Sequence, residues 1–275
     1  MALDKDVAAH YGQADLSAKI LAALTQAGLD VDRLRPEDLA PIDEFHVRGR
    51  EATMEFGRGL GLSPDLHVLD VGSGVGGPAR HLAVAYGCRI TGIDLTEEFC
   101  DAANMLAERV GLADKVTYRA ANALDMPFAD AAFDGAYTQH VAMNIPDKAA
   151  LYREVARVLK PGAGFGIYDV LQGAGGDIVY PTPWARDPAT SFVATDTEMR
   201  DALEAAGFTI ETWRDTTAPG AAWFAAKQQS IAEQGPPPLG FHLLLGPIFA
   251  EMGKNMARNL AENRVALAEI LCRKG

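Results

Sequence analysis

The spacing of apolar residues changes character near residue 66. Before that point, apolar residues recur every three or four positions from residue 16 to residue 24, as on one face of a helix. A charged, proline-containing link spans residues 33–46, and a second helix is predicted over residues 47–60. The first 60 residues are therefore predicted to form an N-terminal helical extension, residues 1–60.

Short apolar runs and amphipathic segments alternate after residue 66. Five runs predict buried strands, at residues 67–71, 88–94, 115–121, 133–139 and 164–170. Three segments between them predict helices, at residues 78–87, 96–111 and 147–159. The last of these helices is expected to be stopped by Pro161 and Gly162. Alternation at this spacing requires right-handed crossovers, which predicts an α/β fold whose parallel sheet is covered on both faces.

The C-terminal part begins with a loop, residues 171–195, that is rich in Gly and Pro. Thr195 and Glu198 then predict a capping box at the start of a helix that ends at Gly207. An alternating run at residues 208–213 follows and predicts another strand.

A helical insert precedes the end of the chain. Residues 218–262 contain two helical stretches around a proline-rich breaker. Residues 264–274 predict a last strand, although Leu267 and Leu271 would also fit a helix. Residues 61–275 are thus expected to form the main domain. Its loop at residues 171–195 and its insert are expected to form a lid over the substrate.

The composition argues against several classes of protein. The 275 residues include 37 acidic and 25 basic side chains, a formal net charge of -12 that would repel nucleic acid. The three cysteines are scattered without a C-x-x-C pair, so neither a zinc site nor a disulfide framework is expected, and the metal prediction is none. No long uncharged apolar stretch or signal peptide is apparent, which predicts a cytoplasmic protein without a membrane span.

The glycine-rich stretch VLDVGSGVGGPARHLA, residues 68–83, carries the main chemical signal. It satisfies G-x-G-x-x-G from Gly72 to Gly77, the dinucleotide fingerprint, and D-x-G-x-G-x-G from Asp70 to Gly76. Both motifs are typical of a strand, a tight turn and a helix that a ligand can approach closely. A pyrophosphate disfavours a nearby carboxylate, so Asp70 favours a cationic ligand instead.

A second acid, Asp94, ends the strand at residues 88–94 and lies 22 residues after Gly72. An acid at this place can bind both hydroxyls of a ribose. Its structural alternative is a helix N-cap, a role for which Thr96 competes. Ribose binding is common to nicotinamide and S-adenosylmethionine sites, so Asp94 does not discriminate between them.

Five ordered motifs do discriminate: VLDVGSGVGG, GIDL, NALDMPF, FDGAYTQH and VLKPGAGFGIYDV. Together they resemble the class I S-adenosylmethionine-dependent methyltransferases over about residues 60–215. The resemblance implies a Rossmann-like, doubly wound sheet of seven strands, mostly parallel with a reversed last strand. It also implies S-adenosyl-L-methionine as cofactor, with S-adenosyl-L-homocysteine as product.

The resemblance implies a set of cofactor contacts along these motifs. Asp70 would orient the loop, Asp94 would bind the ribose, and Asn122 would border the adenine amino edge. Tyr11, in the sequence HYG, would close over the sulfonium or else pack in the core. Apart from Tyr11, the residues expected to contact the cofactor are Asp70, Gly72, Ser73, Gly74, Gly76, Asp94, Leu95, Asn122, Ala123 and Gln139.

The methyl acceptor is less clearly marked. GGPARHLA, HYG and QHVAMNIPDK resemble the branch that contains sarcosine and dimethylglycine methyltransferases and the quinone and sterol C-methyltransferases. This implies a small-molecule acceptor, an amine or amino acid, with C- or O-methylation of a quinone, phenol or other secondary metabolite as the alternative. No partner beyond this acceptor is predicted, and the sequence leaves the oligomeric state open.

Alignment and desolvation supply much of the catalysis in such a displacement, but a hydroxyl or carbon acceptor calls for a base. The candidates are His140, at the end of a strand, and His46, although a lone His is more often structural. The aromatic and polar residues expected in the lid are Tyr180, Trp184, Trp223, Phe241 and His242. Their alternative role is to anchor the insert.

Two other functions remain open at this point. The literal G-x-G-x-x-G allows a nicotinamide-dependent oxidoreductase. The same fold also allows a noncatalytic module that binds the cofactor without turnover.

Overall fold

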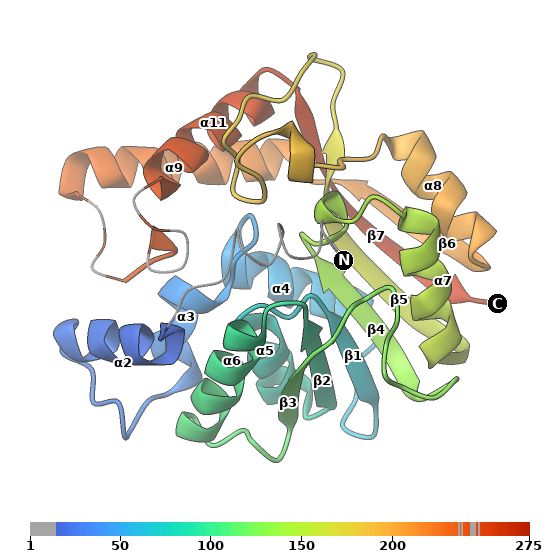
Figure 1. The fold of residues 1–275 in the computed structure, drawn as a ribbon, viewed down its shortest axis with the longest axis horizontal. Helices are drawn as coiled ribbons and strands as arrows, with labels where there is room; N and C mark the ends of the chain where they lie inside the picture. The colour runs from blue at the N-terminus through green and yellow to red at the C-terminus, as the bar shows by residue number, and fades with distance from the viewer. Residues whose placement is uncertain (1–14, 236, 238, 243–245, 247) are drawn as a thin grey trace.

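The computed structural model describes residues 15–235, 237, 239–242, 246 and 248–275. In this part of the chain, seven strands form one sheet in the order β3-β2-β1-β4-β5-β7-β6 (Figure 1). β7 is antiparallel to β5 and β6, whereas the other neighbouring strands are parallel. The strands are β1 (His67–Val71), β2 (Arg89–Asp94), β3 (Val116–Ala120), β4 (Phe133–Gln139), β5 (Leu159–Gln172), β6 (Phe208–Asp215) and β7 (Val265–Lys274). The predicted mostly parallel sheet with a reversed last strand is confirmed.

The helices precede, connect and follow these strands. Their bounds are α2 (Leu16–Gln26), α3 (Pro36–Asp43), α4 (Gly49–Gly59), α5 (Gly77–Tyr86), α6 (Glu97–Arg109), α7 (Lys148–Val158), α8 (Asp196–Ala205), α9 (Thr217–Gln234) and α11 (Phe249–Ala261). Two single 3₁₀ turns, η1 (Ala142–Asn144) and η2 (Pro188–Thr190), lie in the connections. The two helical stretches predicted for the insert correspond to α9 and α11.

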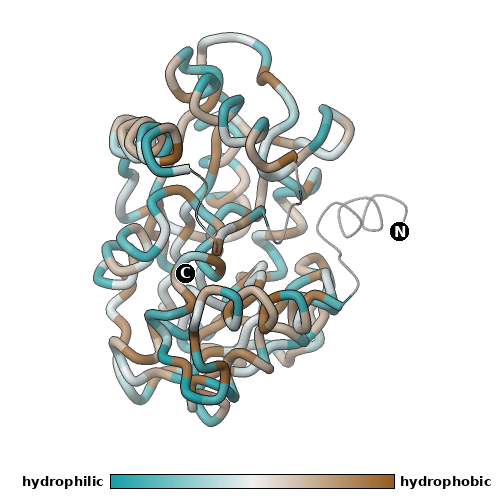
Figure 2. Tube along the Cα trace, turned by 90° about the vertical axis from the view of Figure 1, so that its left-hand side faces the viewer, coloured by the Kyte–Doolittle hydropathy of each residue, from teal (hydrophilic) through white to brown (hydrophobic). Residues whose placement is uncertain are grey.

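The central strands are buried on both faces, as parallel strands between helices are. Along β1, Val68 joins one apolar core with Phe56 of α4 and Leu82 of α5. Its neighbour Leu69 points the opposite way and joins a second core with Leu151 of α7. Hydrophobic and hydrophilic residues are interspersed along the coloured part of the tube (Figure 2). The two cores show that successive residues of a central strand face opposite helix layers.

The N-terminal helices and the insert lie toward the same end of the sheet (Figure 1). Leu16, Ile20 and Leu24 of α2 are buried in a third core that includes Leu106 of α6. α9 and α11 pack against each other and against β7. Both additions thus border the carboxyl ends of the parallel strands, where sheets of this kind bind ligands.

One local prediction was wrong. The expected link at residues 33–46 contains α3, which starts at Pro36 and is capped because Arg35 N donates to the Asp38 carboxylate over 2.9 Å. The helix predicted at residues 147–159 is confirmed as α7, which ends at Val158 with Leu159 as its C-cap, and Pro161 follows that C-cap closely. β5 starts directly at Leu159.

The capping box at Thr195 is confirmed. Its backbone N–H donates to the Glu198 carboxylate over 2.8 Å, and Glu198 N–H donates to the Thr195 hydroxyl over 3.2 Å. Among the helices of the described residues, none is long and apolar enough to span a membrane.

Candidate functional site

The glycine loop after β1 turns tightly and leaves its middle open. Gly72, Gly74 and Gly76 have φ values of 79°, 53° and 83°, which favour glycine. A Cβ on Gly72 would lie 2.3 Å from the Val141 side chain, and one on Gly76 would lie 2.4 Å from the Tyr118 ring. At Gly74 a Cβ would meet nothing within 4 Å. The outer two glycines therefore allow close packing, while Gly74 presents bare backbone to an open space.

That space is a cleft at the carboxyl ends of β1, β2, β3 and β4, with an empty volume of about 1250 Å³. Nine residues expected to contact a cofactor line it: Asp70, Gly72, Ser73, Gly74, Asp94, Leu95, Asn122, Ala123 and Gln139. Gly76 does not, because it lies beneath Tyr118, whose hydroxyl donates to the Gly76 carbonyl over 2.8 Å. Tyr11 lies outside the described residues. The sequence thus placed most of these residues around one cavity.

The Asp94 carboxylate joins two segments of the cleft wall. One oxygen accepts from Gly74 N–H and the other from Thr96 N–H, each over 2.9 Å. Thr96 stands at the N-cap of α6 but makes no side-chain capping bond, and the bond from its backbone N–H to Asp94 ties the start of α6 to the end of β2. Each oxygen keeps a further lone pair for a ligand hydroxyl. Burial raises the pKa of Asp94, while the bonds from Thr96 and Gly74 lower it.

Asn122 also combines a structural contact with a free group. Its Oδ1 accepts from Leu124 N–H over 2.9 Å, which fixes the turn after β3. The amide Nδ2 of the same side chain makes no hydrogen bond to any described residue, so it can donate to a ligand in the cleft.

Several buried polar atoms at the cleft have no hydrogen-bond partner among the described residues. They are Asp70 Oδ2, Ser73 Oγ, Gln139 Oε1 and Nε2, and His140 Nε2. Buried polar atoms are normally paired, so this concentration indicates a polar ligand that pairs them when bound. Burial raises the pKa of Asp70 to about 7. A cationic group beside that carboxyl would restore its charged form.

A second cavity, with an empty volume of about 580 Å³, adjoins the first. Phe45, His46 and His140 line both cavities, so the two are continuous at these side chains. The remaining lining of the second cavity is apolar or aromatic: Val47, Met143, Pro183, Trp184, Trp223, Phe224, Phe241, Phe249, Gly253 and Met256. No Asp, Glu, Lys or Arg of the described residues lines it. Of the residues expected in the lid, Tyr180 and His242 line neither cavity.

The two histidines at the junction differ in their surroundings. The first residue after β4, His140, has φ 55° and its backbone N–H donates to the Tyr168 carbonyl over 2.7 Å. Its ring lies 4.9 Å from the Tyr168 ring and 6.1 Å from that of His46, between centroids. Burial lowers the pKa of His140 well below its usual value and that of His46 to about 4. Both rings are therefore neutral bases at neutral pH.

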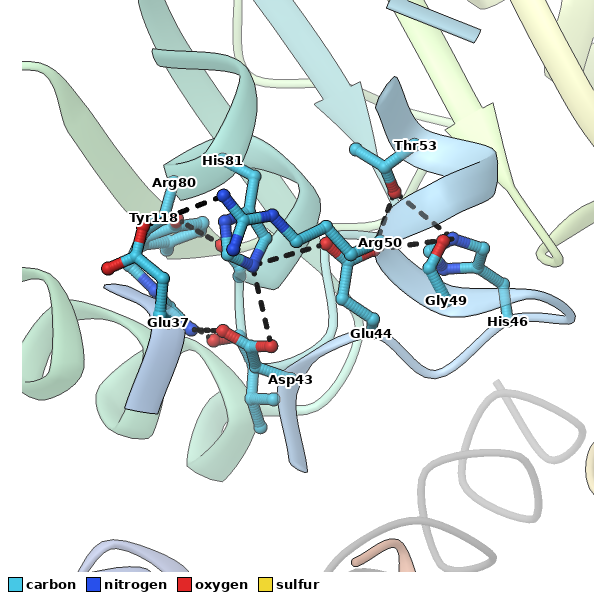
Figure 3. A network of polar contacts seen from close by, with 12 residues as sticks. Glu37, Asp43, Glu44, His46, Gly49, Arg50, Thr53, Arg80, His81 and Tyr118 are labelled. Atoms are coloured by element: carbon cyan, nitrogen blue, oxygen red, sulfur yellow. Dashed lines mark hydrogen bonds and ion pairs between the residues drawn. The ribbon is translucent and has the colours of Figure 1, made fainter. Parts of the chain in front are cut away.

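Sequence reasoning missed a buried polar network beside His46 (Figure 3). Arg80 forms an ion pair with Asp43 over 3.0 Å, and the Asp43 and Glu44 carboxyls both point toward His81. Glu44 also accepts a hydrogen bond from Thr53 over 2.5 Å. Residues 33–46 were expected to form a charged, proline-containing link, and no pattern in the sequence indicates that Asp43 and Glu44 are buried.

Comparisons with known proteins agree with this geometry. Residues 69–167 match the model of the methyltransferase domain family. The chain is 35% identical over 170 residues to the O-methyltransferase resE of Aspergillus sclerotiorum, which spans 62% of each protein. It is 40% identical over 112 residues to the sterol 24-C-methyltransferase ERG6B of Gibberella zeae, or 41% of this chain and 30% of that protein. The chain thus spans between about a third and three fifths of these relatives.

A solved structure shows the same fold in a protein that is named for a different reaction. The [4+2]-cyclase SpnF superposes with a TM-score of 0.67 at 25% identity, over 82% of this chain and 80% of that one. The domain match, the sheet order and the cleft agree on the fold: the chain has the Rossmann-like fold of the class I S-adenosylmethionine-dependent methyltransferases. The cyclase is a reminder that this fold alone does not fix the reaction.

Proposed function

We propose that the chain transfers a methyl group from S-adenosyl-L-methionine to an apolar small molecule that carries a hydroxyl or a nucleophilic carbon. One observation carries the proposal: a polar cleft with unpaired buried groups opens into an apolar cavity, and two neutral histidines line the junction. The relatives named O-methyltransferase and sterol C-methyltransferase support it.

The residues at the cleft fit the cofactor part by part. Asp94 would bind the ribose hydroxyls, Asn122 would donate to the adenine, and Asp70 with Gln139 would face the methionyl end, where an ammonium pairs with a carboxylate. When bound, S-adenosylmethionine supplies a methyl group already activated on a sulfonium. The chain's task is then to bind, to align the acceptor and to exclude water.

The second cavity selects the class of acceptor. A zwitterionic amino acid such as sarcosine needs a counter-charge for its carboxylate, and the described lining offers none. A flat or fused apolar ring would instead contact Trp184, Trp223 and Phe241. We therefore place O- or C-methylation of a phenol, quinol or related metabolite ahead of the amine acceptor expected from the sequence. The loop at 171–195 and the insert at 218–262 would act as the lid, since both contribute to this lining.

Calorimetry with S-adenosylhomocysteine tests the cofactor site. The wild-type chain is expected to bind it, Asp94→Ala to lose binding, and the exposed control Asp114→Ala to bind normally. Binding of NADH in place of S-adenosylhomocysteine would refute the proposal and revive the oxidoreductase reading.

A panel with isotope-labelled cofactor tests the reaction and the acceptor class. Phenols, quinols and sterols are expected to accept label, whereas glycine, sarcosine and dimethylglycine are not. Label on the amines alone would refute the acceptor class. Cofactor binding without turnover on any acceptor would instead support a noncatalytic binding module.

A further inference from the structure

His46 is held by contacts that determine which of its ring nitrogens carries the proton. All of its polar contacts to the described residues involve Nε2, which lies 3.1 Å from the Gly49 carbonyl oxygen, 3.1 Å from Thr53 Oγ1 and 3.3 Å from Glu44 Oε2. A carbonyl oxygen can only accept a hydrogen bond. The proton therefore resides on Nε2.

Thr53 reinforces this assignment. Its hydroxyl donates its single proton to Glu44 Oε2 over 2.5 Å, so toward His46 the hydroxyl oxygen can only accept. The neutral ring then carries its basic lone pair on Nδ1, which has no hydrogen-bond partner among the described residues. Since the ring lines both the polar cleft and the apolar cavity, its free nitrogen belongs to the junction of the two.

We propose that His46 accepts the proton of the acceptor hydroxyl through Nδ1, and that Thr53 and Glu44 are positioning residues that hold the Nε2–H tautomer and stabilise the imidazolium that forms. The proposal rests on the proposed function with a hydroxyl acceptor. Atoms and charges balance in the step: the acceptor oxygen forms a bond to the methyl carbon, and the carbon–sulfur bond breaks with its electron pair going to sulfur. The hydroxyl proton moves to Nδ1.

The surroundings of Glu44 suit this role. Its carboxyl faces Asp43, Arg80, His81, Arg50 and Thr53. Burial and then the neighbouring Asp43 carboxylate raise the pKa of Glu44 to about 8, so this carboxyl holds a proton at neutral pH and can release it when positive charge forms on His46. A base that is oriented by a third group in this way has the arrangement of an activated general base.

His140 lacks such an arrangement. Among the described residues, its Nε2 is buried without a partner and no carboxylate faces its ring; its neighbours there are the rings of Tyr168 and His46. His140 can donate to or accept from a ligand, but nothing in its contacts stabilises a positive charge on it. The contacts therefore favour His46 as the base, whereas the sequence favoured His140 because it follows a strand at the carboxyl edge of the sheet.

Nitrogen-15 NMR of histidine-labelled protein, with S-adenosylhomocysteine present, tests the tautomer without needing an acceptor. The wild-type His46 signals, assigned by their loss in His46→Asn, are expected to show protonated Nε2 and unprotonated Nδ1 at pH 7. Thr53→Val is expected to give a mixture of tautomers, and Thr53→Ser to restore the single one. A proton on Nδ1, or a charged ring at pH 7, would overturn the proposal.

Kinetics with the simple phenol 7-hydroxycoumarin test the role in turnover. His46→Asn is expected to lower kcat about 100-fold or more, within the usual range for removal of a general base. Glu44→Gln and Thr53→Val are expected to lower kcat about 10-fold with little change in KM, and Thr53→Ser to stay near wild type. The matched control is Glu55→Gln, on the same helix α4, where the carboxylate contacts Arg48 and Arg214 instead.

The outcomes separate this proposal from the proposed function. Wild-type protein that binds S-adenosylhomocysteine and methylates the phenol, with Glu44→Gln and Thr53→Val unchanged in kcat, overturns the positioning roles alone. Wild-type protein that binds no S-adenosylhomocysteine overturns the proposed function, while the NMR measurement still decides the tautomer. Melting temperatures of all variants identify any loss of kcat that comes from unfolding.

Discussion

The polar cleft and the apolar cavity meet at two histidines but are built in different ways. Most of the cleft is made from the ends of β1, β2, β3 and β4 and the turns that follow them, so these residues are fixed by the register of one sheet. Most of the cavity is made from the segment between α3 and α4, the loop at 171–195 and the insert, which are joined by packing and by side-chain hydrogen bonds such as those of Asn255 and Asn259. The polar cleft, held by the sheet, suits a cofactor that is the same in all relatives. The apolar cavity, built from separate segments, suits an acceptor that differs among relatives of one fold.

The largest expected effect breaks the cleft and spares the cavity. Asp94→Ala should weaken S-adenosylhomocysteine binding by at least about 100-fold, because two hydrogen bonds to a charged group, each contributing about 1.5 kcal/mol or more, are lost. Isothermal titration calorimetry measures this loss. A change of less than fivefold would mean that Asp94 only braces the loop through Gly74 and Thr96.

The complementary change breaks the cavity and spares the cleft. Trp223→Ala should raise KM for a phenolic acceptor roughly 10-fold, since a buried aromatic contact contributes on the order of 1–2 kcal/mol. Affinity for S-adenosylhomocysteine should stay within twofold of wild type. Equal losses in both measurements would show that the two halves are not separable.

A change in affinity of similar size is expected from the charge of Asp70 in the cleft. The pKa of Asp70 is raised to about 7, so the carboxyl is mostly protonated below that value and ionised above it. Affinity for S-adenosylhomocysteine, which carries an ammonium, should therefore rise about 10-fold from pH 6 to pH 8, a Coulombic gain of about 1.4 kcal/mol. Asp70→Asn should flatten that profile, and a wild-type profile that is already flat would show that the ammonium binds elsewhere.

The smallest effect is expected at α8, whose residues line neither the cleft nor the cavity. Glu198→Ala removes one side of the capping box at α8 and should lower stability by about 1 kcal/mol, with cofactor binding unchanged. Thermal unfolding measures the stability change. A loss of binding in this variant would reveal that stability alone limits the binding measurements above.

The same contrast explains how much the sequence could predict. Asp70, Asp94 and Gln139 each lie at or next to the end of a strand, and parallel strands bring their carboxyl ends to one edge, so period and order sufficed to gather them. The alternation of strand and helix likewise predicted the parallel part of the sheet, whereas its reversed last strand was implied by the family resemblance. Nothing in this logic depends on side-chain packing between distant segments.

Packing between helices carried no comparable signal. Glu44 contacts Thr53 and His81 because α3, α4 and α5 pack against one another. No periodicity of apolar residues predicts which of these helices are in contact. The same holds for the lid: Trp184 and Trp223 line the cavity while Tyr180 and His242 do not, although all four looked alike in the sequence. Aromatic character predicts burial but not the cavity toward which a side chain points.

A crystal structure with S-adenosylhomocysteine tests the central claim most directly, that the polar cleft holds the cofactor and the apolar cavity holds the acceptor. The account predicts both ribose hydroxyls within hydrogen-bond distance of the Asp94 carboxylate and the thioether sulfur facing the junction lined by His46 and His140. A cofactor whose sulfur faces away from that junction, or one bound outside the cleft, would contradict it.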